Sequence, residues 1–125
     1  MNKNSAEVGG AIFSDRNSTV MIINGTFQRN SATSLGSDTN CCYGGALYCQ
    51  SGCTVIIHNS TFNNNTAIRD EELDKNKEAN HGAGGAIAIV EGAKVVISAS
   101  KFNNNEAVGD GGAIYVWNST IHKQM

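Results

Sequence analysis

The stretch GGAIAIVEGAKVVISASKFNNNEA, residues 84–107, decides the fold because the chain repeats its plan almost four times. It opens on a Gly-Gly-Ala-Ile block, continues with an apolar triplet and then reaches Phe102, which Asn105 follows three residues later. Blocks of this kind begin at Gly9, Gly44, Gly84 and Gly111, and a phenylalanine stands 18 residues after each of the first three. Such regular self-similarity is the signature of a repeat architecture.

Each copy offers three short strand-like runs, separated by glycines and polar residues. They are the Ala-Ile segment, the apolar triplet and the pair that ends in phenylalanine. The smallest distance between copies, 27 residues from Gly84 to Gly111, suits three strands and three corners. A helical repeat would show a 3.6-residue apolar face, which is absent. We therefore expect an all-β solenoid, a parallel β-helix of about three to four coils with three short strands per coil.

Stacked coils place equivalent residues directly above one another, about 4.8 Å apart. The recurring aromatic residue predicts an internal ladder of Phe27, Phe62 and Phe102. The recurring asparagine predicts a second ladder at a corner, because asparagine tolerates left-handed backbone geometry and its amide bonds to its neighbours. Its members are Asn4, Asn30, Asn65 and Asn105. Stacking alone explains the recurrence, so a ligand-binding role of the asparagines is the less favoured alternative.

The composition fits one modest unit, residues 1–125, and argues against several function classes. Nine basic and eleven acidic residues give a net charge of −2, without the basic patch of a nucleic-acid-binding protein. No apolar run approaches the roughly 20 residues of a membrane-spanning helix, and the N-terminus carries no secretory signal. Residues 1–6 align with the end of a repeat and the last residues enter a fourth copy, so we expect a fragment truncated mid-coil at both ends.

Two motifs in fixed order carry a resemblance to a known family. The Gly-Gly-Ala-Ile block together with Phe-x-x-Asn, as in Phe62-Asn63-Asn64-Asn65 followed by Gly84-Gly85-Ala86-Ile87, resembles the repeats of the chlamydial polymorphic outer membrane proteins. These motifs cover essentially the whole chain. The resemblance implies a right-handed parallel β-helix, exported to the cell surface, outer membrane or medium and often adhesive. It offers no catalytic residues to transfer.

All four cysteines lie close together, a vicinal pair Cys41-Cys42 followed by Cys49 and Cys53. An even count in a surface protein favours disulfides. We expect Cys49 to pair with Cys53, with one of the vicinal pair left to react or to cross-link chains. A zinc site of four thiolates is the alternative, although the spacing lacks paired Cys-x-x-Cys arms. No cofactor or metal site is otherwise indicated.

Two connections between an Asn-x-Ala corner and the next glycine pair are expanded into insertion loops, residues 33–43 and 68–83. The third connection spans residues 108–110 alone. Insertions in stacked repeats gather on one face, which is often the binding face. The second insertion is charged, and its acidic residues form the expected binding loop: Asp70, Glu71, Glu72 and Asp74.

These features favour a non-catalytic surface or secreted module, an adhesin that contacts a protein or glycan on another cell. The alternative is a fragment of a carbohydrate-active enzyme, a polysaccharide lyase or hydrolase, in which carboxylates such as Asp15 and Asp110 converge. The acidic residues do not line up between copies, which argues against it. Uncapped strand edges at both ends predict self-association of the isolated chain.

Overall fold

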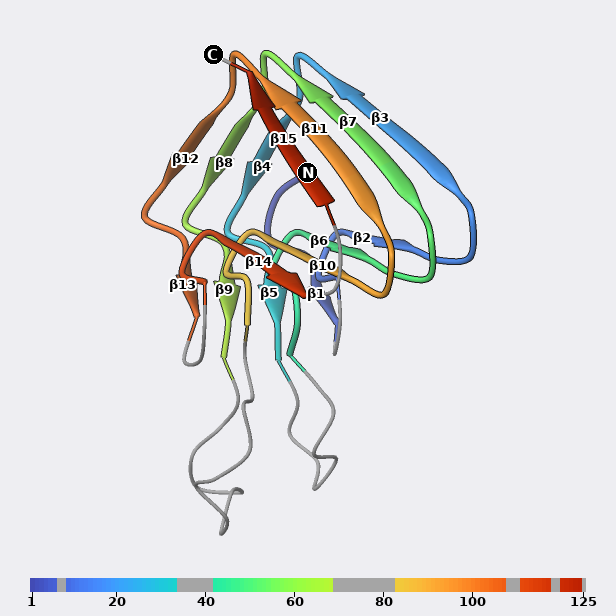
Figure 1. Ribbon diagram of the computed structural model, residues 1–125. Helices are drawn as coiled ribbons and strands as arrows, with labels where there is room; N and C mark the ends of the chain where they lie inside the picture. Colours follow the sequence, from blue (N-terminus) through green and yellow to red (C-terminus); the bar gives the residue numbers. More distant parts are fainter. Residues whose placement is uncertain (7–8, 34–41, 69–82, 108–110, 118–119, 125) are drawn as a thin grey trace, which may run out of the picture.

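The computed structural model describes residues 1–6, 9–33, 42–68, 83–107, 111–117 and 120–124. Fifteen β-strands and no helix occur within these ranges. The chain winds through successive coils whose strands lie side by side (Figure 1). Short runs of β-branched and aromatic residues favour strands, and polar residues follow most of these runs at the corners.

Four parallel sheets form the faces of the coil, and each takes its strands from successive coils. The block sheet carries the Gly-Gly-Ala-Ile blocks and contains β2 (Ile12–Ser14), β6 (Leu47–Cys49), β10 (Ile87–Val90) and β14 (Ile114–Trp117). The triplet sheet contains β3 (Thr19–Ile23), β7 (Thr54–His58), β11 (Lys94–Ser98) and β15 (Thr120–Gln124). The phenylalanine sheet contains β4 (Thr26–Gln28), β8 (Thr61–Asn63) and β12 (Lys101–Asn103). The corner sheet contains β1 (Ser5–Ala6), β5 (Ser31–Ala32), β9 (Thr66–Ala67) and β13 (Glu106–Ala107).

The fold is the all-β parallel β-helix that the repeat predicts, with one addition. Equivalent residues of the copies pair in register, so that Leu47 lies between Ile12 and Ile87. Three of the four sheets correspond to the three expected strands of each coil. The corner sheet escaped the sequence analysis because its strands have two residues each, too few to show an alternating pattern.

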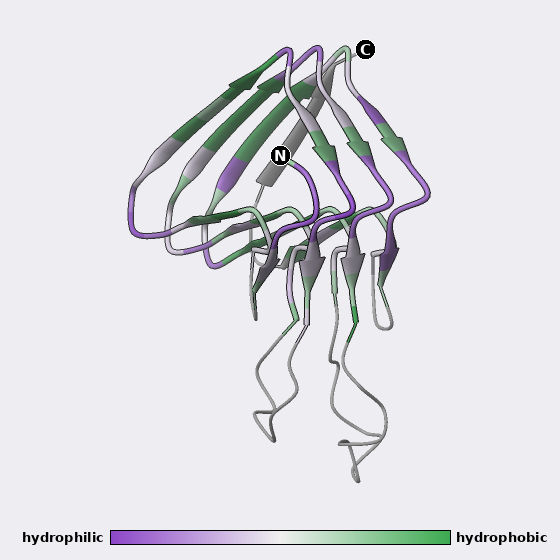
Figure 2. Ribbon diagram, turned by 180° about the vertical axis from the view of Figure 1, so that it is seen from behind, coloured by the Kyte–Doolittle hydropathy of each residue, from purple (hydrophilic) through white to green (hydrophobic). Residues whose placement is uncertain are grey.

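Alternation with a period of two sends one side of each strand into a single continuous core. Strand β7 shows it: Val55 and Ile57 are fully buried, whereas Ile56 between them lies on the outer side. Figure 2 shows β3, β7 and β11 of the triplet sheet as largely hydrophobic and the turn that precedes β3 as hydrophilic. The core therefore runs along the stack of coils, and the turns lie at its solvent-exposed edges.

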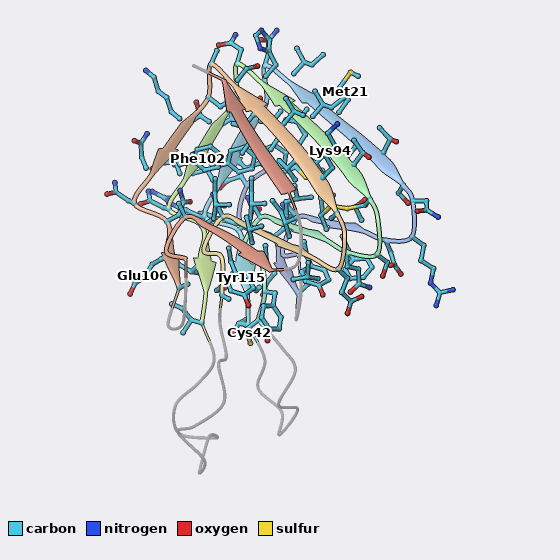
Figure 3. The ribbon with its side chains drawn as sticks, viewed as in Figure 1. Met21, Cys42, Lys94, Phe102, Glu106 and Tyr115 are labelled. Atoms are coloured by element: carbon cyan, nitrogen blue, oxygen red, sulfur yellow. A yellow bond between two sulfur atoms is a disulfide. The ribbon has the colours of Figure 1, made fainter. Side chains whose placement is uncertain are left out.

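Three phenylalanines stack as a column inside the coil. The ring centroids of Phe27 and Phe62 lie 4.8 Å apart and those of Phe62 and Phe102 lie 4.9 Å apart, with planes within 5° of parallel. This spacing equals the distance between neighbouring strands. Phe62 is fully buried between the other two rings, and Figure 3 shows Phe102 on the inner side of its strand.

The corner asparagines form a hydrogen-bonded column. Asn65 Oδ1 accepts hydrogen bonds from the backbone N–H and the side-chain amide of Asn30, each at 3.0 Å. Asn65 donates the same two groups to Asn105 Oδ1, and Asn4 donates them to Asn30 Oδ1. Asn30 and Asn65 are fully buried, so the column satisfies polar groups that water does not reach. Its inner members are therefore structural and closed to a ligand.

The glycine pairs are required by backbone geometry. A Cβ atom on Gly45 would lie 2.1 Å from the carbonyl oxygen of Gly85 in the next coil, far inside van der Waals contact. The preceding residue, Gly44, has a φ of +66°, which L-residues rarely adopt. The block is thus a structural motif that lets neighbouring coils approach.

Removing the central ring of the column tests how much the stack depends on it. Phe62→Ala leaves a cavity between two rings and is expected to lower the free energy of unfolding by about 3–5 kcal/mol. Urea denaturation followed by circular dichroism measures this loss. Met21→Ala is the matched control, because Met21 is 61% exposed and its truncation should cost less than about 0.5 kcal/mol. Equal losses for both variants would contradict an interior column.

Candidate functional site

The two insertions leave the coil and return to it at neighbouring positions. Where the second insertion begins, the backbone N–H of Ile68 donates to the carbonyl of Ala32, the last residue of β5, at 3.0 Å. Where the insertions end, Tyr43 and Ala83 form a parallel β-bridge. Both insertions therefore start from one corner of the coil, between the corner sheet and the block sheet (Figure 1).

Some features considered from the sequence lie outside the described residues, and others can be checked within them. The acidic residues of the second insertion, and with them the expected binding loop, lie outside: Asp70, Glu71, Glu72 and Asp74. Within the described ranges no helix is long and apolar enough to cross a membrane. The same ranges hold no group of three His, Cys, Asp or Glu side chains suited to a metal ion.

A disulfide closes the corner between β6 and β7. It joins Cys49 to Cys53, whose Cα atoms lie 6.1 Å apart and whose side chains are fully buried, and it is the pairing that the spacing favours. Cys42 is disulfide-bonded as well, so it is not the free thiol expected for cross-linking, and Cys41 lies outside the described residues. A disulfide sulfur carries no thiolate, so Cys49 and Cys53 are not available to the alternative zinc site.

A row of aromatic rings covers the outer face of the block sheet. Phe13 and Tyr48 pair in register, with ring centroids 5.4 Å apart. The next coil has Ala88 at this position, and Tyr115 follows one coil further on. Tyr43 bridges the gap, since its ring lies 6.1 Å from Tyr48 and 6.3 Å from Tyr115. We call these four rings the aromatic row; Figure 3 shows Tyr115 on the outer side of the block sheet.

Sequence reasoning missed the aromatic row, although part of its signal is present. The residue after the block is aromatic in three of the four copies, at Phe13, Tyr48 and Tyr115. An outward position needs no aromatic side chain for packing, so this recurrence could have marked a surface. Tyr43 gave no signal, because it belongs to a connection and not to a repeating strand.

Polar groups border the aromatic row at Tyr48. The Tyr48 hydroxyl donates a hydrogen bond to Gln50 Oε1 at 2.8 Å. Burial first, and then the charges of Glu91, Tyr43 and Asp15, raise the pKa of Tyr48 to about 12. Both carboxylates thus add to burial in opposing a negative charge on this phenol.

Asp15 and Glu91 reach this surface from the first and third coils. Asp15 Oδ1 is buried and has no hydrogen-bond partner among the described residues. Glu91 is exposed in a corner with a φ of +58°, and its Oε2 accepts a hydrogen bond from Ser51 Oγ at 3.2 Å. Asp15 and Glu91 do not occupy equivalent positions of the repeat. An alignment of the copies therefore does not reveal that both raise the pKa of Tyr48. Asp110, the other expected carboxylate, lies outside the described residues.

Comparison with known proteins identifies the repeat. The family described as the Chlamydia polymorphic membrane protein repeat matches residues 24–50, 59–89 and 99–116, which together make up more than half of the chain. Each matched segment runs from the turn before the phenylalanine sheet into the next strand of the block sheet. Comparisons with curated proteins and with solved structures gave no match.

A late-ionising tyrosine is expected at the centre of the aromatic row. Tyr48 should ionise near pH 12, well above the ordinary value of about 10, and ultraviolet absorbance of the phenolate follows this step. The folded chain holds this proton more tightly than the unfolded chain, so the stability that Tyr48 contributes is complete below about pH 10 and is lost as the pH rises toward 12. Tyr48→Phe should remove the late step; an unchanged titration of this variant would contradict the assignment.

Proposed function

Because the chain belongs to the family of Chlamydia polymorphic membrane protein repeats, we propose that it is an adhesive module that contacts a protein or glycan on another cell. The family is one of surface and outer-membrane proteins and is not a family of enzymes. In this proposal the stacked coils form a rigid stalk, and the two insertions form the contact surface. Adhesion then depends on many weak contacts made at once and not on catalysis.

Burial of the repeat motif supports a contact surface elsewhere on the chain. Phe62 and Asn65 are fully buried, and the neighbouring backbone closes around Gly45 and Gly85. Residues that are inaccessible in the folded coil cannot touch a partner. In this proposal the partner therefore contacts the insertions and the outward-facing side chains. Stacking of the coils does not require a particular residue type at these positions.

The proposal rests mainly on one observation: the two insertions return to the coil side by side. The bridge between Tyr43 and Ala83 holds the end of one insertion beside the end of the other. Two loops from adjacent coils then offer one contact area larger than either loop provides. In an array of such repeats, simultaneous contacts raise the effective concentration of each loop at a partner surface.

The cysteines support the proposed location at the cell surface or in the medium. Disulfides persist in oxidising compartments and are rare in the reducing cytosol. The disulfide between Cys49 and Cys53 is buried within the coil, and Cys42 is bonded as well. A chain that folds with these bonds is suited to an exported protein.

A carbohydrate lyase or hydrolase is the second candidate, because Asp15 and Glu91 both lie close enough to Tyr48 to affect its ionisation. Hydrolysis of a glycoside needs two carboxylates on either side of the bond. One coil separates the coils of Asp15 and Glu91, which puts their backbones roughly 10 Å apart. Release of reducing ends from a polysaccharide, lost in Asp15→Asn, would favour this candidate over adhesion.

Replacing the insertions with the chain's own short connection tests the adhesive role. The variant carries Val-Gly-Asp, the sequence of residues 108–110, in place of residues 68–83 and of residues 33–42, so that Tyr43 is kept. Beads that display the intact chain should bind cultured cells at least about tenfold better than beads that display the variant, since avidity multiplies each lost contact.

Two controls accompany this test. Circular dichroism must show the same β-sheet content for the intact and shortened chains, because the third copy already passes from its Asn-x-Ala corner to the next glycine pair with three residues. A second variant, Asp70→Asn with Glu71→Gln, Glu72→Gln and Asp74→Asn, keeps the loop and removes its acidic charge. Equal binding by the intact and shortened chains would exclude the insertions as the contact surface.

Self-association through the coil ends is a second part of the proposal. In the 125-residue chain, the described strands β1, β2, β3 and β4 have a neighbour on one side, and so do β12, β13, β14 and β15. The asparagine column also has a direction, because each member donates to Oδ1 of the next. Asn105 of one copy and Asn4 of another would continue the column head to tail, a contact that extends without closing.

Sedimentation velocity over a range of concentrations tests this association. The isolated 125-residue chain should form growing oligomers, and Met21→Lys with Ile23→Lys should suppress them by placing charge on the edge strand β3. Both side chains are exposed, so the substitutions spare the core. A monodisperse monomer at every concentration would exclude association through the ends.

A further inference from the structure

The aromatic row is a surface that the core does not require. Its rings stand on the outer side of the block sheet, and Phe13 is 49% exposed while Tyr43, Tyr48 and Tyr115 are partly buried. Rigid aromatic side chains give large contact area at little entropic cost and are enriched where proteins bind partners. A continuous row across four coils is therefore a preformed contact surface.

The charges beside the row select the kind of group that fits it. Asp15 is partly buried, and its Oδ1 has no hydrogen-bond donor among the described residues, so nothing described at this oxygen offsets the negative charge of the carboxylate. Glu91 is held in place by its left-handed backbone and by the hydroxyl of Ser51. Two carboxylates next to aromatic rings favour a cation with N–H donors over a neutral or acidic group.

We propose that the aromatic row binds a lysine or arginine side chain of a partner protein, with its charged end between Asp15 and Glu91 and its aliphatic stem along Phe13 and Tyr48. Lysine and arginine suit this surface because their stems pack on apolar groups while the charged end stays in a polar setting. The hydroxyl of Tyr48 is already bonded to Gln50, so the partner uses the face of this ring and not its hydroxyl. Three rings of the row stand on the block sheet, and Tyr43 comes from the end of the first insertion. The stem contacts Phe13 and Tyr48 alone, so this inference does not rest on the adhesive role of the loops.

The test measures binding of a penta-arginine peptide to the full chain by isothermal titration calorimetry. The expected result is binding that weakens as salt is added, with at least about tenfold weaker binding of penta-citrulline, which keeps the shape and lacks the charge. Asp15→Asn and Glu91→Gln should each weaken binding about fivefold, and Tyr48→Ala about tenfold. Arg16 is exposed beside Asp15, so Arg16→Gln should strengthen it.

Two controls separate this site from other acidic or aromatic positions. Tyr48→Phe keeps the ring and should bind penta-arginine within about twofold of the intact chain, since the stem contacts the ring and not the hydroxyl. The variant with Asp70, Glu71, Glu72 and Asp74 neutralised should bind as the intact chain does. Loss of binding in that variant, with full binding by Asp15→Asn and Glu91→Gln, would place the peptide on the insertion and overturn the proposal. Equal binding of penta-citrulline would also overturn it.

Discussion

Parallel stacking in exact register is the constraint on which the rest of the structure depends. Each coil lies one strand spacing from the next, so each paired strand residue lies beside the equivalent residue of the neighbouring coil. Leu47 lies between Ile12 and Ile87, and Asn65 shares its hydrogen bonds with the asparagines on either side. A slip of one residue would turn every inward side chain outward and break these bonds together. Residues recur in the sequence because equivalent positions must pack against one another in this register.

This constraint explains which features the sequence predicts. Positions that face their own copies must suit them, so the phenylalanine column, the asparagine column and the glycine pairs all recur and can be read from spacing. The two-residue strands of the corner sheet carry no such pattern. The approach of Asp15 and Glu91 to Tyr48 joins positions that are not equivalent, and Tyr43 comes from a connection. Contacts between unlike positions leave no periodic signal, so these parts of the candidate surface could not be predicted, whereas the recurring aromatic position of Phe13, Tyr48 and Tyr115 could have been.

Inward positions therefore accept fewer residue types than outward positions do. In the block sheet the inward side chains Leu47 and Ile87 are alike and fully buried. The outward positions beside them differ, with Tyr48 in one coil and Ala88 in the next. Variation on the outer face costs the stack little, because neighbouring strands hold together through backbone hydrogen bonds and the core. A family that keeps its repeat and varies its outer face can present different contacts on one scaffold.

The gap at Ala88 shows how a connection becomes part of that outer face. Ala88 points outward yet is fully buried, since the ring of Tyr43 stands between Tyr48 and Tyr115 at this level. The bridge from Tyr43 to Ala83 fixes the same residue against the base of the second insertion. One tyrosine therefore links the corner where both insertions start to the row of rings on the block sheet. The insertions can differ in length or composition without disturbing this surface, provided that the chain still returns to the coil with an aromatic residue before the glycine pair.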